Sequence, residues 1–112
     1  MRLLSNQALQ LWHDVALSQV HDDEPDLSMR QITILLTIYL ETPPHTVRAL
    51  AQKLKVSKPV ITRALDTMGK FGLVSRRRDD ADKRNVLVQR TVKGVLYLER
   101  FADLIAAKAG TV

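Results

Sequence analysis

The chain of 112 residues contains no cysteine, which excludes disulfides, thiolate metal sites and cysteine nucleophiles together. It has only four glycines, and they form no phosphate-cradling loop. No stretch reaches the roughly 18 apolar residues that a membrane span needs. The first 20 residues are too interrupted by polar side chains to be a signal peptide. We therefore expect a cytoplasmic protein with no membrane association.

Groups that could carry enzymatic chemistry are also scarce. His13, His21 and His45 are scattered, and the neighbouring acids show no recognised metal-ligand spacing. No local arrangement supports a Ser/His/Asp triad. Trp12 and the apolar stripes are more typical of a core or a dimer interface than of a cofactor site. The sequence thus predicts a protein that is not an enzyme, with no cofactor and no metal.

Positive charge is abundant and unevenly distributed. The formal net charge is +5, yet residues 1–27 carry one arginine against five acids, a net of −4. Residues 53–93 carry twelve lysines and arginines against four acids, a net of +8. A concentrated positive field attracts polyphosphate, whose counterions are released on binding. This asymmetry favours a nucleic-acid partner over an ordinary solvated surface.

Helical periodicity covers most of the chain. Apolar residues recur at helical spacing over residues 5–20, with Ser5 as the expected N-cap, and over residues 92–109, with Thr91 as the cap. Ser28 and Gln31 form a capping box for a second helix, which must end before two consecutive prolines at 43 and 44. Thr46 is placed to cap a short helix over residues 47–54.

A tight turn then leads into a helix over residues 58–70, the expected recognition helix. Ser57 is its expected N-cap, and Pro59 is tolerated in the first turn, where its missing amide proton costs nothing. The buried face should comprise Val60 or Ile61, Ala64, Leu65 and Met68. The opposite face would then expose Lys58, Thr62, Arg63, Asp66 and Thr67.

After Gly69 or Gly72, either of which can end that helix in a left-handed conformation, come two valine-containing runs, 73–78 and 85–90. The loop between them, residues 79–84, is too charged to pack. These elements predict a mainly helical α+β fold, a winged helix-turn-helix with a three-helix core and a two-stranded wing over residues 74–90. We expect one domain over residues 1–112, with an N-terminal helix (5–20), a core (28–91) and a C-terminal helix (92–109).

Six motifs in order resemble the MarR family of bacterial transcriptional regulators. They are the L-S-x-x-Q-x-x-x-L-L run at 27–36, Leu-Ala at 50–51, SKPVITR at 57–63, GLVSR at 72–76, DKR at 82–84 and TVKG at 91–94. The resemblance covers about 60% of the chain. It implies a homodimer that places two recognition helices in successive major grooves of duplex DNA and two wings at the minor groove, with repression the expected effect on transcription.

Two features depart from that pattern. Family members are usually longer, with a further C-terminal helix shared between subunits, so the dimer geometry and the ligand pocket between domains do not carry over directly. Arg90 stands where the family usually has leucine, and it predicts a more exposed strand end. A small-molecule effector is compatible with the family, but nothing in the sequence supports one.

The expected DNA-binding residues lie on the recognition helix and the wing. Lysine and arginine can donate to guanine in the major groove, and an arginine suits a narrow minor groove. The candidates are Ser57, Lys58, Pro59, Thr62, Arg63, Arg77, Arg78, Lys83 and Arg84. Asp82 would orient an arginine rather than face phosphate, and Arg76 is expected to pair with Asp82 and orient the wing.

The main alternative is a winged-helix protein-interaction module without specific DNA binding, because such folds can serve as scaffolds. The arginine-rich wing argues against it, since a scaffold needs no such charge. The broad apolar faces of the first and last helices predict a symmetric dimer interface.

Overall fold

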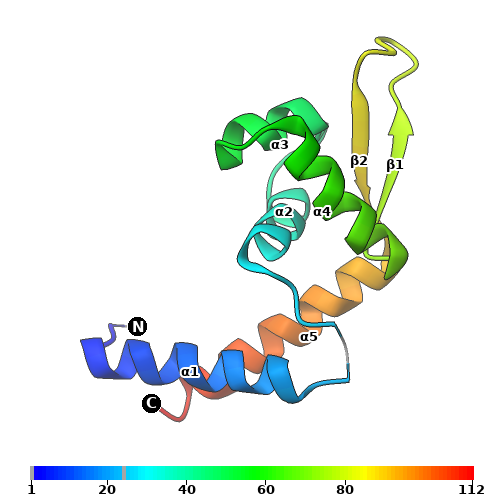
Figure 1. Ribbon diagram of the computed structural model, residues 1–112. Coiled ribbons are helices and arrows are strands. Elements are labelled where there is room, and N and C mark those ends of the chain that lie inside the picture. The colour runs from blue at the N-terminus through cyan, green and yellow to red at the C-terminus, as the bar shows by residue number, and fades with distance from the viewer. Residues whose placement is uncertain (1, 24) are drawn as a thin grey trace. The chain divides into compact units, whose positions relative to one another are not determined.

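A computed structural model describes residues 2–23 and 25–112 of the chain (Figure 1). The elements run in the order α1 (Ser5–His21), α2 (Met29–Leu40), α3 (Val47–Leu54), α4 (Lys58–Lys70), β1 (Val74–Arg78), β2 (Val86–Arg90) and α5 (Val92–Ala109). The predicted α+β fold, mainly helical with a two-stranded wing, is confirmed. The chain forms two compact units: a winged-helix unit, Leu27–Tyr97, and a terminal unit, Met1–Asp26 with Leu98–Val112.

The core of the winged-helix unit lies among α2, α3, α4 and the root of the wing. Its fully buried side chains are Ile34, Ile38, Leu50, Ile61, Leu65, Met68 and Leu73. Capping sets where two of these helices begin. Ser28 accepts a hydrogen bond from the Gln31 amide while its own amide donates to the Gln31 side chain, and the Thr46 hydroxyl accepts one from the Ala49 amide. Both predicted caps are confirmed.

The turn between α3 and α4 separates the two helices sharply. Lys55 takes a left-handed conformation with φ of 57°, and its amide caps the end of α3 by donating to the Ala51 carbonyl. Pro59 lies in the first turn of α4, as predicted. Ser57 occupies the N-cap position, as predicted, although its side chain makes no capping hydrogen bond. The hydroxyl of Ser57 is therefore not committed to the helix.

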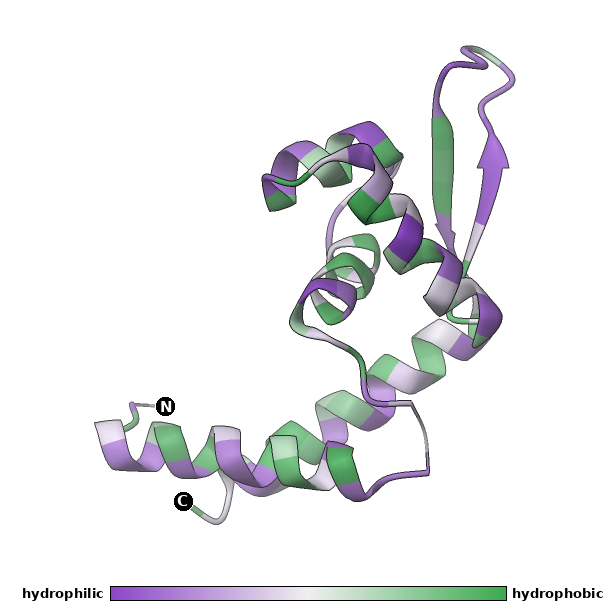
Figure 2. Ribbon diagram, viewed as in Figure 1, coloured by the Kyte–Doolittle hydropathy of each residue, from purple (hydrophilic) through white to green (hydrophobic). Residues whose placement is uncertain are grey.

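The wing is an antiparallel pair whose register places Val74 opposite Arg90 and Arg78 opposite Val86. Its two strands differ in character, because β1 is mostly hydrophilic and β2 mostly hydrophobic (Figure 2). Gly72, with φ of 75°, makes the left-handed turn that ends α4 and starts the wing.

Hydrogen bonds also connect the wing to the segment before α3 and to the start of α5. The Val88 amide donates to the His45 carbonyl, which ties β2 to the segment before α3. The Thr91 hydroxyl accepts from the Gly94 amide, capping α5 as predicted, and donates to the Gly72 carbonyl. The root of the wing is thus rigidly connected, while the loop at its tip projects away from α4 (Figure 1).

The terminal unit consists of α1 and the part of α5 from Leu98 onward. Helix α1 begins at Ser5 with Leu4 in the cap position, so Ser5 is the first helical residue and not the predicted N-cap. Side-chain capping comes from Gln7, which accepts a hydrogen bond from the Leu4 amide. Among the described residues, no helix is long and apolar enough to cross a membrane.

Candidate nucleic-acid interface

Helix α4 separates a buried face from a cationic one. Ile61, Ala64, Leu65 and Met68 are buried, which confirms the predicted core face and selects Ile61 over the half-buried Val60. The exposed side of the first two turns carries Lys58, Pro59, Thr62 and Arg63. Neither Lys58 nor Arg63 has an ion-pair partner within residues 2–23 and 25–112. Two cationic side chains on this face are therefore available to an anionic partner.

Farther along α4, Asp66 connects the helix to the wing. Its carboxylate accepts a hydrogen bond of 2.7 Å from the guanidinium of Arg76 on β1. The predicted pairing of Arg76 with Asp82 was therefore wrong. The physical reason is the strand register: Arg76 lies opposite Val88, near the root of the wing, whereas Asp82 lies in the loop at its tip. Arg76 can still orient the wing, through α4 instead of through the loop.

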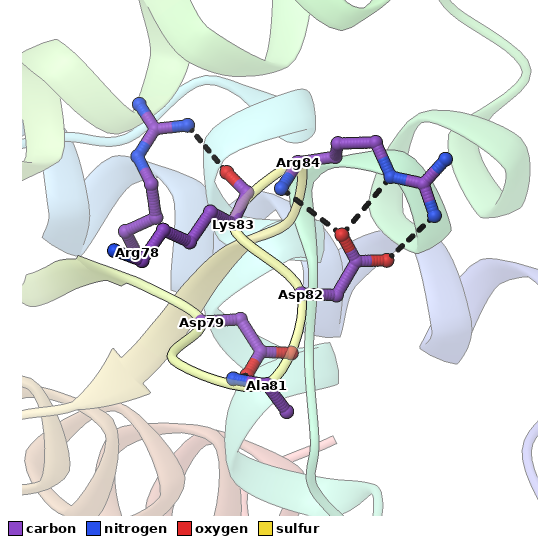
Figure 3. A network of polar contacts seen from close by, with 6 residues as sticks. All are labelled: Arg78, Asp79, Ala81, Asp82, Lys83 and Arg84. Carbon is purple, nitrogen blue, oxygen red and sulfur yellow. Dashed lines mark hydrogen bonds and ion pairs between the residues drawn. The ribbon is translucent and has the colours of Figure 1, made fainter.

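At the wing tip, Asp82 holds Arg84 in place (Figure 3). The Arg84 side chain donates from Nε to Oδ1 and from Nη2 to Oδ2 of Asp82, each at 3.0 Å, and the Arg84 amide donates to Oδ1 at 3.1 Å. These side-chain hydrogen bonds, with the backbone one, lower the pKa of Asp82, and the same carboxylate raises the pKa of Arg84. We call this Asp82–Arg84 pair the wing-tip clasp. The Arg84 side chain remains 82% exposed, so the clasp orients the guanidinium without covering it.

The other arginines of β1 are only partly available to a ligand. Arg78 donates to the backbone carbonyl of Lys83 at 2.7 Å, which braces the loop across its width (Figure 3). Asp79 accepts a hydrogen bond from the Ala81 amide and shapes the turn. Arg77 lies 3.8 Å from Asp80, a contact between exposed groups that is worth little. Arg77 and Lys83 thus remain candidates for phosphate contact, whereas Arg78 also has a structural role.

Arg90, which stands where the family usually has leucine, connects the end of β2 to helix α2. Its guanidinium donates to the carbonyls of Ile38 and Tyr39, at 3.0 and 2.6 Å, and lies 5.3 Å from the centroid of the Tyr39 ring. Those carbonyls belong to the last turn of α2, where intrahelical partners are missing. The strand end is exposed, as predicted, but its arginine caps a helix.

Within the described part of the chain, no group of three or more His, Asp or Glu side chains could hold a metal ion. A hollow of about 640 Å³ lies between the segment before α3 and the wing, lined by Ile38, Pro43, Pro44, His45, Arg77, Leu87, Val88, Gln89 and Arg90. His45, in the wall of this hollow, is buried, and its Nε2 lies 3.2 Å from the carbonyl oxygen of Glu41. This histidine therefore has a structural role.

Two functional contacts were absent from the sequence expectations. Asp66 was treated only as an exposed residue of the helix, and Arg78 only as a phosphate contact. For Asp66 a signal did exist, because it is the one acid on a helix whose expected DNA-binding face carries lysine, threonine and arginine. An acid there is repelled by phosphate unless a neighbouring cation neutralises it.

Comparison with known proteins agrees with this geometry. The organic hydroperoxide resistance transcriptional regulator of Bacillus subtilis (strain 168) is 29% identical over 82 residues, which cover 73% of this chain and 55% of the relative. The HTH-type transcriptional repressor YetL of the same organism is 40% identical over 52 residues, which cover 46% of this chain and 31% of YetL. The chain thus spans about half, or less, of the length of these curated relatives. Both are named as transcription factors and neither as an enzyme, as the sequence predicts.

Among solved structures, the transcriptional repressor CouR bound to a 23-mer DNA duplex matches with a TM-score of 0.73 and 25% identity, covering 95% of this chain and 72% of CouR. CouR comes from Rhodococcus jostii RHA1. The model of the MarR family matches residues 27–86, which is more than half of the chain and includes α2, α3, α4 and the start of β2. The chain therefore belongs to the MarR family.

Proposed function

We propose that this chain is a sequence-specific regulator of transcription that binds duplex DNA and acts mainly as a repressor. The observation that carries the proposal is the cationic face of α4, where Lys58 and Arg63 have no acidic partner among the described residues, together with Arg84 held exposed at the wing tip. The solved complex of CouR with DNA and the name of YetL as a repressor support it.

The two cationic regions suit different grooves. The exposed first turns of α4 present long donor side chains and the Thr62 hydroxyl and methyl, which suit base edges in a major groove. Arg84 is a single oriented guanidinium on a narrow hairpin, which suits the negative potential of a minor groove. Ser57 and Pro59 would contact the backbone beside α4, and Arg77 and Lys83 would contact phosphates beside the wing.

The test measures affinity for a duplex that the protein has selected from a random pool. Lys58→Ala or Arg63→Ala should each cost ~1 to 3 kcal/mol of binding free energy, and Arg84→Ala somewhat less. The affinity of the unchanged protein should fall steeply with salt because phosphate contacts release counterions. A flat salt response, with all three variants binding like the parent, would favour the protein-interaction module instead.

We further propose that the regulator is a homodimer joined through the terminal unit. Its apolar side chains are unusually exposed for so small a unit: Leu9 is 72% exposed, Val20 68% and Trp12 56%. A second copy would cover them and would also pair two recognition helices, as a palindromic site requires.

Light scattering at tens of micromolar should give twice the chain mass of 12.7 kDa. Leu9→Lys should yield monomers, because it places a charge in the proposed interface. Leu40→Lys is the matched control, since Leu40 of α2 is 71% exposed but lies in the winged-helix unit. Monomers in the parent protein would refute the dimer.

A further inference from the structure

A small hollow lies on the side of α4 that packs against α2. It has a volume of about 230 Å³ and is lined by Ser28, Arg30, Gln31, Val60, Arg63, Ala64 and Thr67. Two arginines from separate helices thus share one depression within the winged-helix unit. Buried Ala64, next to Arg63 on α4, also lines the hollow, and its small side chain leaves room for the depression.

The lining of this hollow carries positive charge without compensation. No carboxylate is among its lining residues, and neither Arg30 nor Arg63 forms an ion pair with any residue that the structure describes. Its neutral groups are already used: Ser28 and Gln31 cap each other, and the Thr67 hydroxyl donates to the Arg63 carbonyl. Two like charges beside one another are mutually unfavourable, so the site favours an anion.

The side of α4 that carries Asp66 differs from the hollow in its charge. There Asp66 neutralises Arg76, so the cationic side chain nearest the helix is already satisfied. Asp66 lies three residues beyond Arg63, which places it about 60° from Arg63 around the helix, on the side away from Ala64 and Thr67. A helix lying in a major groove has phosphates along both of its flanks. The hollow at Arg30 lies on the α2 flank of α4, where no acid like Asp66 is among the lining residues.

We propose that Arg30 and Arg63 form a binding site for a phosphodiester of duplex DNA on the α2 side of the recognition helix. This inference depends on the proposed function, since it concerns how the same protein holds DNA. Arg30 contacts the phosphate from α2, and Arg63 contributes to the site while remaining able to reach the groove. The site positions α4 along the DNA axis but carries no sequence information of its own.

The experiment compares Arg30→Ala with Arg2→Ala, which removes the same charge from the terminal unit. Affinity is measured on the selected duplex and on a scrambled duplex, over a series of salt concentrations. Arg30→Ala should weaken binding to both duplexes equally, by roughly tenfold, and make the salt slope shallower by about one. Arg30→Lys should keep most of the affinity, and Arg2→Ala should match the parent. Circular dichroism checks that each variant is folded.

Replacing single phosphates by neutral methylphosphonates locates the contact. One position should weaken the parent protein but leave Arg30→Ala unaffected. Inorganic phosphate at 10 mM, a concentration on the order of the dissociation constant of a weak site for the free ion, should not displace the DNA. Parent-like affinity and slope in Arg30→Ala would overturn the inference, as would a loss confined to the selected duplex or displacement by free phosphate. Failure of the proposed function is a separate outcome, in which the parent protein itself binds neither duplex.

Discussion

The winged-helix unit and the terminal unit differ in how well each buries its apolar residues. Among the described residues, the seven largest fully buried side chains all lie in the winged-helix unit. Among the described residues of the terminal unit, only Val15 and Leu98 are buried apolar residues, while α1 exposes most of its large ones. The winged-helix unit therefore contains its own hydrophobic core, whereas the terminal unit leaves most of its apolar side chains uncovered. This difference is what we expect if one unit binds DNA and the other joins two copies.

The same substitution in both units tests this contrast most strongly. Leu65 is fully buried in α4, so Leu65→Ala should lower the free energy of unfolding by about 3 kcal/mol. Leu9→Ala should cost less than about 0.5 kcal/mol in dilute protein, because Leu9 is exposed there. Urea unfolding followed by circular dichroism measures both, and Trp12, the only tryptophan, reports separately on α1. Equal losses would remove the distinction between the units.

Two glycines of the winged-helix unit give a second comparison. A Cβ at Gly94 would meet the backbone of Leu73, so Gly94→Ala should destabilise the root of the wing by roughly 1 to 3 kcal/mol. A Cβ at Gly69 has nothing within 4 Å, so Gly69→Ala should stabilise α4 by up to about 1 kcal/mol. Thermal unfolding should shift the two midpoints in opposite directions. Shifts of the same sign would contradict the close approach at Gly94.

The Asp66–Arg76 pair tests whether α4 and the wing are held together for DNA binding. Both groups are too exposed for a large effect on stability, so Asp66→Ala should change it by less than about 1 kcal/mol. The ratio of affinities for selected and scrambled duplexes should fall several-fold, because the wing and helix are no longer held in register. Asp103→Ala, which removes an exposed acid from α5, is the control of equal charge. An unchanged ratio would reduce the pair to a surface contact.

The smallest effect should come from the wing-tip clasp. Because the pKa of Asp82 is lowered by its hydrogen bonds to Arg84, the clasp is fully formed above the ordinary range for aspartate. It should be lost only as the pH falls through that lowered value. An NMR titration of the Asp82 carboxyl carbon in the parent protein and in Arg84→Ala follows this directly, and the midpoint should be lower in the parent. The same midpoint in both proteins would show that the clasp is absent in solution.

Local signals were sufficient to predict the elements of the fold. Capping at Ser28 and Thr46, proline in the first turn of α4 and a left-handed glycine before the wing depend on neighbouring residues, so they can be predicted from short stretches. Contacts between elements were harder to predict. Arg76 pairs with Asp66 instead of Asp82 because of the strand register. Arg90 reaches the α2 carbonyls because of how the helix packs beside the strand.

For the candidate site too, local features could be predicted from the sequence, but contacts between elements could not. Charge and helical spacing identified which side chains of α4 would be exposed, and the structure agrees except at Thr67, which is half-buried. That Arg30 lies beside Arg63 could not be predicted, because 33 positions separate them and only the packing of α2 on α4 brings them together.

The central claim is that DNA is bound by the first turns of α4 and the tip of the wing. Amide chemical shifts recorded while the selected duplex is added test it most directly. We predict the largest changes at residues 57–63 and 79–84, with smaller ones at the start of α2. Changes confined to α1 and the end of α5, with residues 57–63 and 79–84 unaffected at saturating duplex, would contradict the account.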